Sequence, residues 1–168
     1  GISMIHQELN LIPDLTVAEN LFLGQEMTHR LGMIDYPTMN ALAEKILAGY
    51  QFPYPVTTKM RNVSIGWQQI AEIARAIYQK SDILIMDEPT SALSGGEIEI
   101  LFKKMAQLKA QGQTIIYISH RLEEIFQIAD DIVVLRDGNY VNSAPVADVN
   151  RQTLIQWMIG HEISDQRY

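Results

Sequence analysis

The run from Ile83 to Asp87 constrains the fold of this chain more than any other segment. Four apolar residues end in a carboxylate, with Ser81 and Asp82 before the run and Pro89 after it. A short apolar run with such boundaries is typical of a buried central strand in a parallel sheet. Ligands of α/β proteins bind at the carboxyl ends of such strands. We therefore predict an α/β fold with Asp87 and Glu88 at a ligand-binding edge.

The two adjacent carboxylates suit the hydrolysis of a nucleotide. Successive side chains of a strand point to opposite faces, so Asp87 could hold a metal while Glu88 orients a water molecule. The same pair would also suit an ordinary strand end, because acidic residues before a proline are common in turns. The pair alone does not decide between these interpretations.

A second apolar run, Thr114 to Ser119, ends in His120 and Arg121. A histidine at the carboxyl end of a neighbouring strand is placed to meet the same ligand as Asp87 and Glu88. Taken alone, a histidine in such a place is more often an ordinary loop residue than a catalytic one.

Upstream, the stretch 63–69 precedes an amphipathic helix. Its apolar face consists of Ile70, Ile73, Ala74 and Ile77. Ser64 and Gly66 stand where this helix begins, and a helix N-terminus presents free backbone N–H groups and a positive dipole end to an anion. This is a third candidate element of a phosphate site.

In this order, the segments resemble the ATPase domain of ABC transporters over nearly the whole chain. The resemblance implies a partial P-loop NTPase core with a parallel sheet and an inserted helical subdomain, which uses ATP and magnesium. Gln7 matches the Q-loop and would touch the metal. Asp87 matches the metal-binding Walker B carboxylate, Glu88 the residue that polarises the attacking water, and His120 the switch histidine that senses the γ-phosphate.

The resemblance also implies residues that meet a second subunit. The signature segment would bind the nucleotide held by the opposite cassette, and the D-loop would line the dimer seam. The residues assigned to these two segments are Ser64, Gly66, Gln68, Ser91, Ala92 and Leu93.

The amino-acid sequence of several segments resembles more specifically the first cassette of tandem-cassette monosaccharide importers, of the ribose, galactose, xylose and arabinose type. These segments are 5–11, 87–93, 117–121 and 134–138. The resemblance implies a peripheral subunit at the cytoplasmic face of the membrane. Its partners would be a second cassette, a membrane permease and, indirectly, a periplasmic sugar-binding protein.

Two departures from the family pattern matter. None of the ten glycines is followed by lysine, so the chain lacks the G-x-x-x-x-G-K-[ST] loop that grips phosphates. We interpret the chain as a fragment cut just before the Q-loop, inactive alone. Trp67 stands where the common signature has glutamine, and its ring could either disturb the dimer seam or simply pack at the helix start.

We expect one partial ABC ATPase domain in three parts. The α/β core comprises 1–13 and 80–150, the helical signature subdomain 14–79, and the C-terminal helix with the start of a linker 151–168. Within the subdomain we expect helices from Thr16, where Glu19 completes the spacing of a capping box, and over 38–48. Its apolar residues Leu21 and Phe22 could meet the permease or belong to the core.

Ser94 and Glu97 have the same spacing as Thr16 and Glu19 and predict the start of a long helix in the core. Asp137 and Gly138 are a strong turn pair and predict a hairpin.

Composition excludes some functions and leaves others open. A net charge of -7 argues against nucleic acid as the main ligand. Two alternatives to a transport ATPase remain. One is a soluble ABC ATPase of the DNA-repair or translation type, and the other is a non-catalytic module that donates its signature and D-loop to a partner's ATP site.

Overall fold

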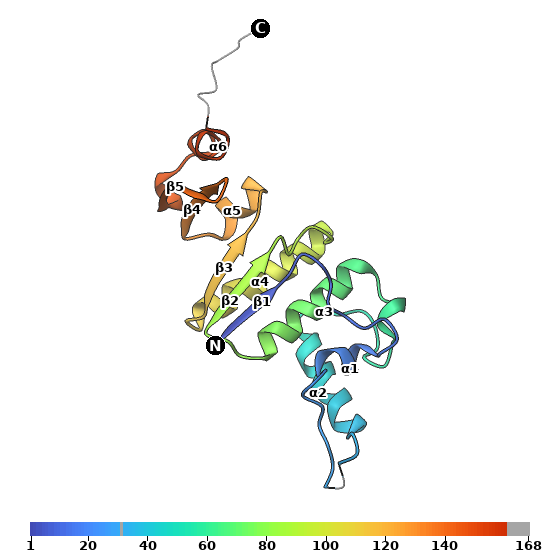
Figure 1. Cartoon of the computed structure of the whole chain (residues 1–168). Coiled ribbons are helices and arrows are strands. Elements are labelled where there is room, and N and C mark those ends of the chain that lie inside the picture. Colours follow the sequence, from blue (N-terminus) through green and yellow to red (C-terminus); the bar gives the residue numbers. More distant parts are fainter. Residues whose placement is uncertain (31, 161–168) are drawn as a thin grey trace. The chain divides into compact units, whose positions relative to one another are not determined.

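The computed structural model describes residues 1–30 and 32–160. Its backbone forms two compact units, Gly1–Ile118 and Ser119–Tyr168 (Figure 1). The boundary falls directly after the strand that precedes His120. The division into three parts expected from the sequence cuts the chain at other positions and stays a prediction.

The first unit contains a three-stranded parallel sheet. Its strands are β1 (Ile2–Ile5), β2 (Ile83–Asp87) and β3 (Thr114–Ile118), in the order β1-β2-β3. All pairings are parallel, with Ile5 opposite Met86 and Asp87 opposite Ile118. The predicted central strand is therefore confirmed, and the carboxyl ends of all three strands lie at one edge.

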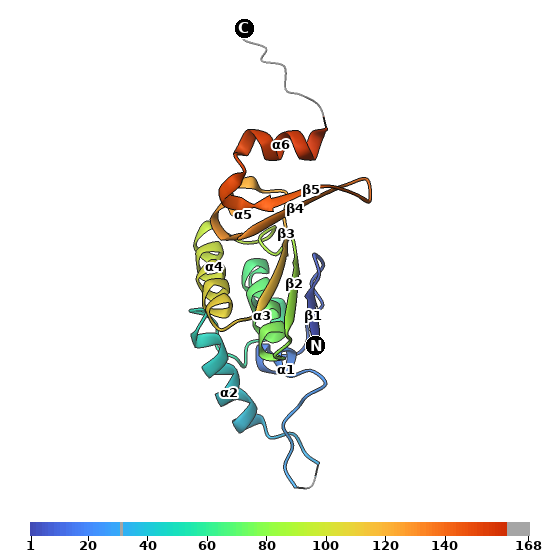
Figure 2. The ribbon, with the colours of Figure 1, turned by 90° about the vertical axis from the view of Figure 1, so that its left-hand side faces the viewer.

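The two faces of this sheet differ. Helices α3 (Ile65–Tyr78) and α4 (Gly95–Ala110) lie on one side of it (Figure 2), and Leu84 and Met86 are fully buried on that face. The other face carries Ile2, Met4, Ile116 and Ile118, which remain 44 to 68% exposed. The sequence predicted that β2 is buried. Only the face with Leu84 and Met86 is buried, because among the described residues helices cover that side of the sheet.

Local capping signals explain where the helices of the first unit begin. Thr16 and Glu19 form the expected capping box at α1 (Val17–Leu21), and Ser94 and Glu97 form another at α4. Helix α2 (Tyr36–Ala48) begins two residues before the predicted Thr38, because Asp35 caps it and Pro37 suits its first turn.

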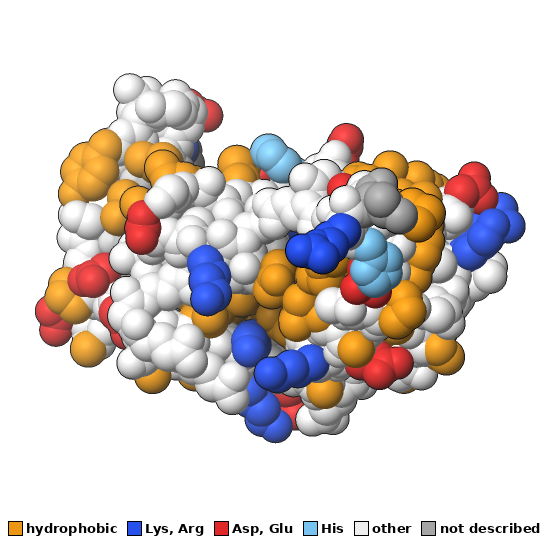
Figure 3. Space-filling view, turned by 90° about the horizontal axis from the view of Figure 1, so that it is seen from below, with side chains coloured by type: hydrophobic (Ala, Val, Ile, Leu, Met, Phe, Trp, Pro, Cys, Tyr) orange, Lys and Arg blue, Asp and Glu red, His pale blue; other side chains and the backbone are white. Residues whose placement is uncertain are grey.

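The helical part of the first unit has its own apolar core. Leu21 and Phe22 are buried in it, which confirms the core interpretation of these residues, and Phe22 stacks edge to face on Tyr78. Met33 and Tyr36 stay exposed. Figure 3 shows apolar side chains gathered on the lower surface, with basic side chains beside them.

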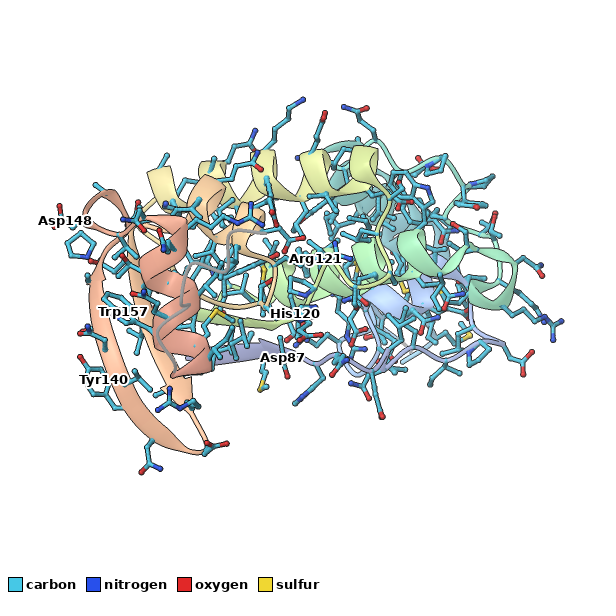
Figure 4. The ribbon with its side chains drawn as sticks, turned by 90° about the horizontal axis from the view of Figure 1, so that it is seen from above. Asp87, His120, Arg121, Tyr140, Asp148 and Trp157 are labelled. Atoms are coloured by element: carbon cyan, nitrogen blue, oxygen red, sulfur yellow. The ribbon has the colours of Figure 1, made fainter. Side chains whose placement is uncertain are left out.

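The second unit is built on a β-hairpin. Its elements are α5 (Leu122–Ile128), β4 (Asp131–Arg136), β5 (Asn139–Pro145), the short 3-10 helix Val146–Asp148 and α6 (Arg151–Ile159). Asp137 and Gly138 turn the hairpin as predicted, both with positive φ. Ile132, Val134, Val149 and Leu154 form the core, against which Trp157 of α6 packs (Figure 4).

The predicted linker from His161 onward lies outside the described residues. Among the residues that are described, no helix combines the length and the apolar character needed to span a bilayer.

Candidate active site

Asp87 and Glu88 leave the sheet with different backbone conformations. Asp87 is the last residue of β2, in register with Ile118 on the open face. Glu88 has φ +45, in the left-handed region that a glutamate rarely adopts. Its N–H donates to the Ile118 carbonyl at 2.9 Å, and its own carbonyl accepts from the Ser91 N–H at 3.2 Å. Such strain persists only where surrounding bonds enforce it, and it clusters at functional sites.

Gln7 follows β1 at the same edge of the sheet. Ile5 and Met86 are the last pair between β1 and β2. Gln7 and Asp87 therefore both follow the last paired residue of these two parallel strands. Gln7 is exposed. The sheet therefore brings the two predicted metal-side residues to one edge.

The chain directly after Gln7 is attached to α3. The Asn10 N–H donates to both carboxylate oxygens of Glu72, at 3.2 and 3.3 Å. Glu72 is buried, and burial raises its pKa, while the Asn10 N–H and the charges of Arg75 and His6 lower it. The exit of the Q-loop segment is thus fastened to the signature helix.

A second buried side chain holds the same segment a little further on. Asn20 accepts from the Ile12 N–H at 2.7 Å and donates to the carbonyls of Ile12 and Thr16, both at 3.0 Å. The loop from 10 to 16 is therefore held by side chains of the helical part.

Ser64 is the N-cap of α3 and is exposed. In the described part of the chain its hydroxyl makes no capping hydrogen bond, and its N–H donates to the Tyr54 hydroxyl at 3.3 Å. The first N–H groups of the helix are therefore not satisfied by this cap. A 14-residue helix that starts in this way offers both N–H groups and a hydroxyl to an anion.

Gly66 is buried against the carboxylate of Glu97 on α4. The Glu97 carboxylate also accepts from the N–H of Ser94 at 2.7 Å, and Ser94 directly follows residues 91–93. Sequence analysis assigned Gly66 to the nucleotide only, and the structure adds a steric reason for glycine at this position.

Trp67 and Gln68 both make contacts within their own subdomain. The Trp67 ring stacks edge to face on Phe52 at 5.5 Å, which favours the packing interpretation of this residue. The Gln68 amide nitrogen donates to the carbonyls of Met60 and Val63, at 3.2 and 2.8 Å. Nucleotide binding by Gln68 stays a prediction, and its amide nitrogen is already engaged by these carbonyls.

The D-loop residues follow the left-handed turn at Glu88. Ser91 is exposed, Ala92 is half-buried and Leu93 is buried, with its N–H on the Thr90 carbonyl at 3.1 Å. Their place at a dimer seam stays a prediction.

His120 belongs to the second unit and is exposed. Its two sequence neighbours are bonded to one another and to Glu124. The Arg121 N–H donates to Ser119 Oγ at 3.0 Å, and the Ser119 hydroxyl donates to Glu124 Oε2 at 3.2 Å. The switch role of His120 stays a prediction.

Sequence reasoning missed the residues that support this site: Tyr54, Glu72 and Glu124. Two signals were available. Glu72 lies between the apolar residues Ala71 and Ile73 of an amphipathic helix, where a carboxylate must find a partner. Glu124 lies four residues after the candidate histidine, in the first turn of the helix that follows it.

Comparison with known families decides the identity. The model of the family described as ABC transporter matches residues 1–91, more than half of the chain. The chain belongs to the ABC transporter family. The matched range contains the segments that the sequence analysis assigned to the Q-loop, the signature and the Walker B strand.

Solved structures of ABC cassettes share its fold. A dimeric post-hydrolysis state of the ATP-binding cassette MJ0796, bound to ADP and Pi, is 26% identical with a TM-score of 0.73, and the match covers 86% of this chain. A second dimeric structure of MJ0796, described as a bacterial ABC transporter cassette, is 24% identical with the same TM-score. The match spans 62% of the length of either cassette. These likenesses confirm the α/β P-loop NTPase fold with its parallel sheet.

Proposed function

We propose that this protein is the ATP-binding and ATP-hydrolysing subunit of an importer, with Glu88 polarising the attacking water. The observation that carries the proposal is the Walker B strand in a member of the ABC transporter family. Its two carboxylates stand at the carboxyl edge of the sheet, and the second is held in a left-handed conformation. Phosphoryl transfer needs little more from a protein than positioned charges and a positioned nucleophile.

The residues present fit a magnesium nucleotide. Magnesium is usually bound through one or two carboxylates together with substrate phosphates, and Asp87 with the Gln7 amide oxygen supplies such a donor set. In residues 1–30 and 32–160 no cluster of three His, Cys, Asp or Glu side chains could hold a metal alone. When bound, magnesium neutralises charge on the β- and γ-phosphates.

We further propose that each ATP is held between two cassettes. Ser64 and the N-terminus of α3 would meet the γ-phosphate of the nucleotide on the partner cassette, and 91–93 would line the seam. The dimeric form of the MJ0796 cassette supports a two-cassette arrangement. His120 would sense the γ-phosphate from its own cassette.

The transported substrate and the membrane partners are the finer part of the proposal. The resemblance of the segments 5–11 and 87–93 to sugar-importer cassettes supports a monosaccharide importer that contains a permease and a periplasmic sugar-binding protein. The ATPase would then act at the cytoplasmic face of the membrane. The rate of ATP hydrolysis by the reconstituted importer tests this proposal. We expect the rate to rise when the sugar-loaded binding protein is added.

Glu88→Gln in the full-length, ATP-hydrolysing protein tests the catalytic assignment. The amide keeps the size of the side chain and removes its charge. We expect ATP binding to persist while turnover falls by about a hundredfold or more. Turnover equal to the wild-type rate would reject Glu88 as the water-polarising residue.

A second function, as a non-catalytic module, is favoured for the 168 residues taken alone. No glycine in them is followed by lysine, so a phosphate-binding loop would have to come from outside this sequence. Magnesium-dependent hydrolysis by the 168-residue chain should be compared with that of a longer chain that contains the phosphate loop. We expect activity only in the longer chain, and hydrolysis by the shorter one would reject this interpretation.

A further inference from the structure

We propose that Glu124 is a positioning residue for His120, because its carboxylate holds the residues on both sides of the histidine. The inference rests on the proposed function, in which His120 acts on the γ-phosphate. All the groups involved lie within the second unit, and Figure 4 shows His120 and Arg121 where the chain enters α5.

The two carboxylate oxygens of Glu124 are divided between the neighbours of His120. Oε2 accepts from the Ser119 hydroxyl at 3.2 Å, and Oε1 accepts from Arg121 Nη1 at 3.1 Å. Because Ser119 precedes the histidine and Arg121 follows it, the carboxylate restrains the chain on both sides of His120.

Backbone bonds close this arrangement. The Arg121 N–H donates to Ser119 Oγ at 3.0 Å, so the serine hydroxyl links both partners of the carboxylate. The Glu124 N–H donates to the Arg121 carbonyl at 3.1 Å. These bonds join the residue before His120, the residue after it and Glu124 in one ring, which restrains the backbone at His120.

The burial of Glu124 indicates a role beyond attachment of α5. Its side chain is only 8% exposed, whereas that of Arg121 is 42% exposed. Burial of a carboxylate is costly unless it is paired and hydrogen-bonded. The apolar residues Leu122, Ile125 and Phe126 already pack α5 against the core of this unit. The buried carboxylate is bonded to Ser119 and Arg121, and these bonds connect α5 to the segment 119–121.

Glu123 supplies a matched control next to Glu124 on the same helix. Its side chain is 70% exposed and pairs with Arg151 at 2.8 Å, away from Ser119 and Arg121. Its replacement removes one carboxylate from the same turn of α5 and leaves the ring of bonds around His120 intact.

The test is a double-mutant cycle on ATP hydrolysis by the full-length protein, with Glu124→Ala, His120→Ala and the pair combined. Glu124→Ala should lower kcat by about tenfold to a hundredfold, the usual cost of a misplaced catalytic group. KM for ATP should stay within about twofold, because in the proposal Glu124 acts through His120 and not on the nucleotide. Glu123→Ala should turn over ATP at the wild-type rate. In the His120→Ala background, Glu124→Ala should cause no further fall.

Three outcomes would overturn the inference, and the first two leave the switch assignment of His120 standing. Either Glu124→Ala hydrolyses ATP as fast as Glu123→Ala, or its effect multiplies with that of His120→Ala as an independent loss would. If His120→Ala itself has no effect, the switch assignment fails together with the inference. If His120→Ala lowers turnover and Glu124→Ala lowers it by the same factor in both backgrounds, the inference is rejected and the switch assignment stands. Should Glu124→Ala not fold, Glu124→Gln enters the same cycle, since its amide keeps an acceptor for Ser119 and loses the charge paired with Arg121.

Discussion

A β-carbon added at Gly66 would lie 2.5 Å from Oε2 of Glu97 and 2.9 Å from its carboxyl carbon. The two residues belong to different helices, Gly66 to the first turn of the signature helix α3 and Glu97 to the first turn of α4. Glu97 cannot simply swing away, because Oε2 accepts from the Ser94 N–H and the side chain is buried. The start of the signature helix is therefore packed against the helix that follows the D-loop.

This packing predicts that Gly66→Ala destabilises the protein. The new methyl group must displace the Glu97 carboxylate, with loss of its cap on α4 and strain in a tight contact. Together these should cost about 2 kcal/mol in the free energy of unfolding. Thermal or denaturant unfolding of the purified protein measures the loss.

Gly96→Ala is the matched control for that prediction. Gly96 lies one residue before Glu97 in α4, and a β-carbon there meets nothing within 4 Å. Alanine should leave stability unchanged or raise it by up to about 1 kcal/mol. Equal destabilisation by Gly66→Ala and Gly96→Ala would contradict the proposed clash. Glu97→Ala should abolish most of the extra cost of Gly66→Ala.

Glu88→Gly should separate stability from activity. Glycine adopts the left-handed conformation of residue 88 without strain, so the free energy of unfolding should rise by about 1 kcal/mol while ATP turnover is lost. Lys80→Gly provides the comparison, because Lys80 also has a positive φ, of 51°, and lies outside the site. It should raise stability and leave turnover intact. A loss of stability in Glu88→Gly would show that the carboxylate itself holds the turn.

Glu72→Gln should change how stability depends on pH. Burial raises the pKa of Glu72 above its ordinary 4.5, so the folded protein binds this proton more tightly than the unfolded chain does. The contribution of Glu72 to stability is therefore present at low pH and is lost as the pH rises from 4.5 through the folded pKa.

The amide of Glu72→Gln carries no such penalty and still offers an oxygen to the Asn10 N–H. The variant should be more stable than the wild type at neutral pH, and the difference should shrink toward pH 4. Unfolding curves between pH 4 and 8 supply the comparison. Parallel curves for the two proteins at all pH values would refute the raised pKa.

The Trp67 ring should be coupled energetically to Phe52. Their centroids are 5.5 Å apart and the rings are nearly perpendicular, an edge-to-face pair. A double-mutant cycle with Trp67→Ala and Phe52→Ala should give a coupling of about 1 kcal/mol in unfolding free energy. Ile65→Ala, at an exposed position of the same helix turn, should change stability by no more than about 0.5 kcal/mol. Strictly additive effects of Trp67→Ala and Phe52→Ala would show that the ring pair contributes nothing.

Local signals in the sequence were sufficient for most of the elements. The apolar run before Asp87 predicted the central parallel strand, and the spacing of Thr16 to Glu19 and of Ser94 to Glu97 predicted two helix starts that the structure confirms. The Asp137-Gly138 pair predicted the hairpin turn. These features follow from periodicity, capping and turn chemistry, which act between residues close in the chain.

The candidate site could be predicted only in part. Order along the chain pointed to Gln7, Asp87 and Glu88, and the parallel register brings the ends of β1 and β2 to one edge. The partners that hold the site were missed because they are distant in sequence. Asn10 and Glu72 are 62 residues apart, and no local pattern reports such a bond.

The amino-acid sequence by itself determined the elements, their order and the residue types at the phosphate edge, because these depend on neighbours within a turn or a strand. Only the tertiary structure decided that Glu97 excludes a side chain at residue 66, that β2 is buried on one face, and that the Q-loop exit is bonded to α3. Each of these depends on how buried groups from distant segments satisfy one another's volume, charge and hydrogen bonds, and that is settled only when the segments pack.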